Sequence, residues 1–109
     1  MKIPLKPISV NQCWQGRRFK TPLYTKYEKD CLMILPKKDI GLPPYLISLE
    51  FGFSNKASDL DNPIKPTLDI LQKKYGFNDS EVYELRISKK IVKKGQEYTL
   101  ILIEQWKQH

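Results

Sequence analysis

A stripe of apolar residues with helical spacing constrains the fold of this chain more than any other feature. Four apolar side chains recur at intervals of four, three and four residues: Ile64, Leu68, Leu71 and Tyr75. This spacing indicates an amphipathic helix. Asn62 and Pro63 resemble an N-cap followed by a first-turn proline, and Gly76 is suited to end the helix. Pro66 lies close to the start, so we expect an irregular first turn.

Period-two and helical patterns predict the elements on either side of this helix. The expected strands cover residues 2–8, 45–53, 82–92 and 97–106, with a hairpin turn at 93–96. A first helix is expected over residues 26–35, with Thr25 and Glu28 as a capping box and Pro36 at its end. The order is βαβαββ. It predicts one small α+β domain over residues 1–109, with two helices and a mainly antiparallel sheet.

The length and composition are those of one globular domain. The chain has 109 residues, of which 40% are hydrophobic and 28% charged, enough for one core. No apolar run approaches the roughly 20 residues that span a bilayer, and the N-terminus lacks the apolar segment of a signal peptide. We therefore expect a cytoplasmic protein that does not enter a membrane, with Cys13 and Cys31 as free thiols.

The chain is strongly basic. Nineteen Lys and Arg against twelve Asp and Glu give a formal net charge of +7. Residues 1–50 contain nine basic and four acidic side chains, and residues 51–109 contain ten and eight, so most of the excess lies in the first half. Such a surface suits a phosphate backbone. The alternative is a basic protein without a polyanionic partner.

Basic and aromatic residues alternate in the segment 13–24. Its basic residues are Arg17, Arg18 and Lys20, and its aromatic residues are Trp14, Phe19 and Tyr24. Cations contact phosphates and rings stack on bases, so this segment is a candidate nucleic-acid surface. The aromatic residues are equally suited to a core.

Acidic residues and one lysine are grouped around the predicted second helix. Asp59 and Asp61 are two residues apart before it, Lys65 and Asp69 are four apart on it, and Asp79 follows it. Carboxylate oxygens suit Mg²⁺ or Mn²⁺, and such an ion polarises a phosphoryl oxygen and lowers the pKa of a bound water. A nearby lysine stabilises negative charge developing on phosphorus.

Each of these features also has a simpler explanation. Acidic residues before a helix are favoured by capping and by the helix dipole, and Lys65 with Asp69 forms a common type of surface ion pair. Other catalytic schemes lack their residues, because the one histidine is His109 and no glycine-rich phosphate loop or zinc-ligand spacing is present.

The acid–lysine pattern resembles a known family. The sequence Asp-Leu-Asp-Asn-x-x-Lys at 59–65, with Asp69, Leu71 and Gly-Phe-Asn-Asp-x-x-Val at 76–82, is similar to the signature of the RusA-type Holliday-junction resolvases. Pro-x-Ser-x-Asn at 7–11, Lys-Thr at 20–21 and the basic turn at 93–95 also match. The resemblance covers nearly the whole chain.

The resemblance implies a RusA-like fold and a homodimeric, Mg²⁺-dependent endonuclease that cuts four-way DNA junctions by paired nicks. By position, Asp59, Asp61 and Asp79 match the metal-binding acids and Lys65 the essential basic residue, and Asp69 matches a further acid. Ser9, Asn11 and Gln12 match a DNA-contacting segment. Two positions depart from the pattern: only Lys56 represents a frequent basic run before Asp59, and Asn78 replaces a frequent acid.

Water attack on phosphorus would leave 5′-phosphate and 3′-hydroxyl ends. A junction has approximate two-fold symmetry with two scissile phosphates, which favours a symmetric dimer with two sites. Two alternatives stay open: a nuclease for branched DNA in general, and a nucleic-acid-binding module without catalysis.

Overall fold

The computed structural model describes residues 1–16 and 19–108. The elements in chain order are β1 (Lys2–Ile3), the 3-10 helix η1 (Val10–Gln12), β2 (Trp14–Gln15), β3 (Phe19–Lys20), α1 (Pro22–Ile34), β4 (Tyr45–Phe53), α2 (Ile64–Tyr75), the 3-10 helix η2 (Asp79–Glu81), β5 (Val82–Ile91) and β6 (Tyr98–Gln105). Apart from the short β2–β3 pair, the main elements follow the predicted order βαβαββ. The α+β class and the two helices are confirmed.

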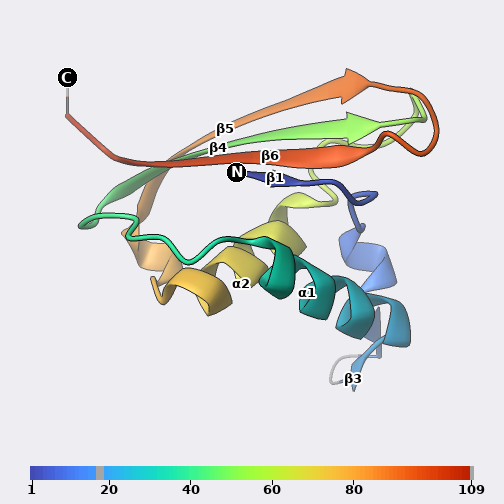
Figure 1. Cartoon of the computed structure of the whole chain (residues 1–109), viewed down its shortest axis with the longest axis horizontal. Helices are drawn as coiled ribbons and strands as arrows, with labels where there is room; N and C mark the ends of the chain where they lie inside the picture. Colours follow the sequence, from blue (N-terminus) through green and yellow to red (C-terminus); the bar gives the residue numbers. More distant parts are fainter. Residues whose placement is uncertain (17–18, 109) are drawn as a thin grey trace.

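One four-stranded sheet carries the fold, with the strand order β1-β6-β4-β5. β6 runs antiparallel to both β1 and β4, whereas β5 runs parallel to β4. Both helices pack on the same face of this sheet (Figure 1). The opposite face carries no helix from the described residues, so the domain has two layers.

The prediction that β5 and β6 form a hairpin is wrong, because β4 lies between them. β4 follows α1 and precedes α2, and α2 returns the chain so that β5 pairs with β4 in parallel. β6 then takes the other side of β4. β4 occupies the centre because its side chains are the most continuously buried of any strand. The turn at 93–96 therefore crosses the end of β4.

The first helix begins four residues earlier than predicted. Its N-cap is Thr21, whose hydroxyl oxygen accepts a hydrogen bond from the Tyr24 N–H at 3.1 Å, and Pro22 occupies the first helical position. A threonine followed by proline is a stronger start signal than the Thr25–Glu28 pair. Glu28 thus lies inside α1, and the helix ends before Pro36 as expected.

The second helix confirms the predicted irregular start and the glycine stop. Its N-cap is Pro63 with no side-chain cap, rather than Asn62. Pro66 is tolerated because the first turn lacks intrahelical N–H partners in any case. Gly76 ends the helix in the left-handed conformation, with φ of 73°. The buried side is rotated from the predicted stripe and consists of Pro66, Thr67, Ile70 and Leu71.

The predicted first strand over residues 2–8 is much shorter, covering only Lys2–Ile3. Pro4 and Pro7 lack the N–H that a ladder needs, so pairing with β6 stops before them. Ile8 is nevertheless buried in the core. The segment after β1 therefore contributes packing rather than strand pairing.

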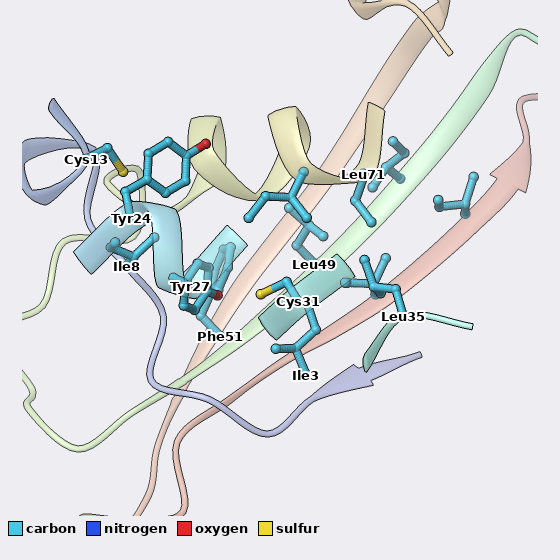
Figure 2. Packing of buried hydrophobic residues seen from close by; sticks show 14 of the residues in the cluster. Ile3, Ile8, Cys13, Tyr24, Tyr27, Cys31, Leu35, Leu49, Phe51 and Leu71 are labelled. Carbon is cyan, nitrogen blue, oxygen red and sulfur yellow. The ribbon is translucent and has the colours of Figure 1, made fainter. Parts of the chain in front are cut away.

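The core lies between the sheet and the two helices (Figure 2). Leu49, Phe51 and Phe53 all point into it from β4, as predicted. Cys13 and Cys31 are fully buried in the same cluster and form no disulfide, which confirms the expectation of two free thiols. No helix in the described part of the chain is long and apolar enough to cross a membrane.

A glycine on β4 makes room for an aromatic ring on the open face of the sheet. A Cβ atom at Gly52 would lie 2.5 Å from the Tyr98 ring. The ring is fixed there by a 2.8 Å hydrogen bond from its hydroxyl to Glu50, and the Lys2 ammonium lies 5.1 Å from its centroid. Gly52 is therefore needed for this close approach.

We predict that Gly52→Ala lowers the free energy of unfolding by about 1–3 kcal/mol, because the added methyl group displaces the Tyr98 ring. Chemical denaturation measures the effect. The double variant Gly52→Ala/Tyr98→Leu should show much less than the sum of the two single losses. Ser48→Ala, on the same face of β4, should change stability by no more than about 0.5 kcal/mol. Additive losses would contradict the steric explanation.

Both thiols are buried, and this burial raises the pKa of Cys13 and of Cys31 from 9.0 to about 11. We predict that both react slowly with a thiol reagent at pH 8 in the native protein and rapidly in denaturant. Because the folded pKa values are raised, the stability that they contribute is present below pH 9 and is lost as the pH rises toward 11. Fast native labelling would contradict this packing.

Candidate functional site

The candidate site lies along the exposed side of α2, where Lys65 links two acidic residues. The Lys65 Nζ donates a hydrogen bond to Asp69 Oδ1 at 3.0 Å and lies 3.8 Å from Asp79 Oδ2. The Gln72 amide donates to the other oxygen of Asp79. Asp79 follows α2 in sequence, so the chain turns back along the helix to reach these side chains. Lys65, Asp69 and Asp79 are therefore gathered as one group.

The electrostatics of this group keep the lysine charged. The hydrogen bond to Asp69, together with the charges of Asp69 and Asp79, raises the pKa of Lys65 above its ordinary value of 10.5. Partial burial acts in the opposite direction and is outweighed. A persistent cation at an exposed position can bind a phosphate oxygen or stabilise negative charge formed there.

Asp59 lies in a second part of the site, beside the segment 9–12. A hollow of about 150 Å³ is lined by Asp59, Ser9 and Gln12 among other residues. The Val10 N–H donates to the carbonyl of Asn62 at 2.9 Å, which fixes η1 against the start of α2. Two of the predicted DNA-contacting residues are thus neighbours of a predicted metal ligand.

The polar side chains in this segment also have local partners. The Ser9 hydroxyl accepts from the Asn11 N–H at 3.2 Å, and the Gln12 side-chain oxygen accepts from the Ser9 N–H at 3.1 Å. The side chains of Ser9 and Gln12 form a capping box on η1, each accepting from the backbone N–H of the other. Asn11 itself is exposed. Ser9 and Gln12 therefore shape η1, whatever else they contact.

The three predicted metal ligands are not gathered into one cluster. Among residues 1–16 and 19–108, no three His, Cys, Asp or Glu side chains are grouped so that they could hold a metal ion. Asp59 and Asp61 are exposed before α2, and exposed Asp79 is bonded to Gln72 and close to Lys65. The donor set is chemically suited to a hard divalent cation, but binding one ion with all three residues requires Asp79 to exchange its present partners.

The predicted basic residues are distributed over several elements. Lys20 pairs with Glu28 on α1 at 2.8 Å, and its ammonium lies 5.3 Å from the centroid of the Tyr24 ring. Lys56 is exposed in the loop after β4. Arg17 and Arg18 lie outside the described residues. Lys20 therefore has a structural partner, whereas Lys56 contributes an exposed positive charge three residues before Asp59.

Sequence reasoning missed Gln72, Lys73 and Lys89. Gln72 lies three and seven residues beyond Asp69 and Lys65, a spacing that places all three on one side of a helix and was available as a signal. Lys73 pairs with Glu28 at 3.0 Å. Lys89 donates to the carbonyls of Lys56 and Ser58 at 3.3 and 2.9 Å, a long-range contact without a sequence signal.

A scan against protein-family models and a search of curated protein sequences found no match to this chain.

Glu28 on α1 connects the two helices through its ion pair with Lys73 on α2, and its replacement gives a test. Partial burial disfavours its ionised form, but hydrogen bonds from Lys20 and Lys73 outweigh that effect and lower its pKa from the ordinary 4.5. We predict that Glu28→Gln lowers the free energy of unfolding by about 1 kcal/mol at neutral pH.

The pH dependence of this effect has a definite sign. Because the folded pKa of Glu28 is lowered, its stabilisation is present above pH 4.5 and is lost as the pH falls through the folded value. Denaturation of wild type and variant at pH 7 and pH 3 should show the difference shrinking in acid. Asp30→Asn, which breaks an exposed ion pair on the same helix, should have little effect. A constant difference would contradict the ionic explanation.

Proposed function

We propose that this chain is a metal-dependent endodeoxyribonuclease that resolves four-way DNA junctions. The observation that carries the proposal is the Asp-Leu-Asp-Asn-x-x-Lys pattern at 59–65, whose lysine contacts Asp69 and approaches Asp79 on one exposed helix side. The basic chain, with its net charge of +7, adds attraction for a phosphate backbone.

In this proposal Asp59, Asp61 and Asp79 hold Mg²⁺, or Mn²⁺ in its place. The bound ion supplies Lewis-acid polarisation of the phosphoryl oxygen and a water of lowered pKa. Lys65 keeps its charge because of its acidic neighbours, so it stabilises negative charge on the phosphate. Asp69 positions the Lys65 ammonium through the 3.0 Å hydrogen bond.

The remaining predicted residues position the DNA. Ser9, Asn11 and Gln12 lie on or beside η1 near Asp59, where they would contact the backbone next to the cut. Lys20 and Lys56, with Arg17 and Arg18, supply positive charge. Hydrolysis of one phosphodiester bond yields a 5′-phosphate and a 3′-hydroxyl end.

Two copies are part of the proposal, because a junction presents two scissile phosphates related by approximate two-fold symmetry. A symmetric homodimer carries two sites and twice the charge of one chain. We place the protein in the cytoplasm. A nuclease acting on branched DNA in general would show similar rates on forks and junctions, which separates it from a junction resolvase.

A binding module without catalysis is the second candidate. The observation that favours it is the Lys65 ammonium, which lies among the acidic side chains where a cation would bind. Calorimetric titration with Mg²⁺ and Mn²⁺ distinguishes the two. A module would bind junction DNA without taking up either ion.

We predict that Asp59→Asn, Asp61→Asn and Asp79→Asn each reduce Mg²⁺-dependent nicking of a synthetic four-way junction by at least about 100-fold. Junction binding, measured by fluorescence anisotropy, should persist or tighten, because each change removes a negative charge near the phosphates. Asp30→Asn serves as the matched control and should cut at the wild-type rate. Cutting retained by all three site variants would reject the proposed function.

A further inference from the structure

β5 is a long edge strand of the sheet. Nine of its ten residues, all but Tyr83, pair with β4 on one side, and no strand from the described residues pairs with its other side. It forms the outer edge of the sheet in Figure 1. At the opposite edge, β6 is partly covered by β1. An edge of this length exposes a row of backbone donors and acceptors that can accept another strand.

The sequence of β5 leaves this edge accessible. It contains neither proline nor glycine, the residues that usually interrupt an edge. Leu85 and Ile91 are 41% and 46% exposed, although their alternation with buried partners on β4 places them on the helix side of the sheet. Leu85 also borders a hollow of about 370 Å³ between α2 and β5. Apolar surface thus continues up to the free edge.

The charges near the two ends of the strand are complementary to those of a second copy of β5 that runs antiparallel to it. Glu84 lies near its beginning and Lys90 near its end, with Arg86 and Lys89 between them. When two such strands run antiparallel, the acidic end of each lies against the basic end of the other. We propose that β5 pairs antiparallel with β5 of a second copy of this chain, forming one continuous eight-stranded sheet.

The charges and a bulge select the register. The pairing with β4 shifts by one residue at Tyr83, so regular strand begins at Glu84. With Ile87 opposite Ile87 of the second copy, seven residues from 84 to 90 face one another without interruption. Glu84 then faces Lys90 of the second copy twice, and opposite charges across strands are stabilising.

The neighbouring registers are less favourable. Pairing centred on Arg86 places two arginines opposite each other, and pairing centred on Ser88 places Arg86 opposite Lys90. Like charges directly opposite are destabilising. Pairing centred on Leu85 reaches the bulge at Tyr83 after three facing pairs.

The pairing adds a specific dimer interface to the proposed function. It rests on that function only for the requirement that two copies associate. Because the two-fold axis is perpendicular to the sheet, the helix faces of both copies point the same way. Lys65 and Asp79 lie beside the β5 edge of that face. The two candidate sites would therefore flank the axis on one side of the dimer, where one junction can contact both.

Charge reversal tests the pairing in the full chain by sedimentation velocity across a concentration series. Glu84→Lys or Lys90→Glu alone places like charges opposite each other at two positions, and we expect the dimer dissociation constant to rise about tenfold. The double variant Glu84→Lys/Lys90→Glu restores opposite charges and should regain most of the affinity. Lys26→Glu on α1 makes the same charge change as Lys90→Glu and should leave association unchanged.

A cysteine scan tests the register independently. Residues directly opposite in an antiparallel pair have Cα atoms about 4.5–5.5 Å apart, within the range of a disulfide. Under mild oxidation, the Ile87→Cys variant should therefore form a disulfide between position 87 of one copy and position 87 of the other. Ser88→Cys lies two positions out of register with itself and should cross-link much less. The native thiols do not compete, because both are buried.

A monomer at all concentrations, or a dimer unaffected by both single reversals, overturns the inference. Lys90→Glu and the cysteine pair suffice if Glu84→Lys does not fold, because Glu84 also accepts hydrogen bonds from Arg86 and Trp106. Failure of the proposed nuclease function can be distinguished from failure of the β5 pairing. A dimer that responds as expected but cuts no junction rejects the proposed function and leaves the pairing intact.

Discussion

The parallel pairing of β4 with β5 is the constraint on which the rest of the structure depends. Two parallel strands cannot be joined by a tight turn, so the chain must return along the sheet between them. α2 makes this return, and its buried side chains supply the packing that holds it there. The same connection places β4 in the centre, leaves β6 to pair on its other side, and makes β5 an edge strand.

This connection also determines how the acidic residues are arranged. Asp59 and Asp61 lie between β4 and α2, whereas Asp79 lies between α2 and β5. A helix of 12 residues is about 18 Å long, so these acids start at opposite ends of it. The chain after Gly76 returns along the helix as far as Gln72 and the Lys65 ammonium. Lys65, in the first turn of α2, therefore interacts with Asp79 from beyond the end of the helix.

Lys65 has two roles that depend on each other. Its ammonium screens the repulsion between Asp69 and Asp79, and these carboxylates in turn stabilise its charge. A divalent cation or a phosphate entering this group would change both relations, because a cation competes with the ammonium and an anion competes with the carboxylates. The group is thus suited to respond to a ligand that carries both charges, such as a metal-bound phosphate.

Local signals predicted most of the elements, and long-range pairing accounts for the errors. The end of α2 at Gly76 was predicted correctly, because this helix stop depends on the backbone conformation of the glycine itself. The predicted start of α1 was wrong, because Thr21 caps the helix and Pro22 begins it, upstream of the plausible capping box at Thr25. The hairpin was wrong because the sequence around 93–96 specifies a turn but not which strands are neighbours.

The site shows the same limit of local information. The helical spacing of Lys65 and Asp69 predicted their contact, which needs only one element. The return of Asp79 to Gln72 depends on the path of the chain beyond Gly76, and no spacing rule describes that path. The contact between Lys89 and the loop at Lys56 depends on the parallel register of β5.

The charge distribution links the site to the edge strand. A chain of net charge +7 repels its own copy overall, so opposite charges that face each other favour a contact between copies. Within β5, Glu84 is the one acid against Arg86, Lys89 and Lys90, so the strand carries a net charge of +2, and only the facing Glu84–Lys90 pairs offset this repulsion. Pairing through β5 therefore sets Glu84 of each copy against Lys90 of the other, and it leaves residues 1–50, which contain most of the excess positive charge, outside the paired strands.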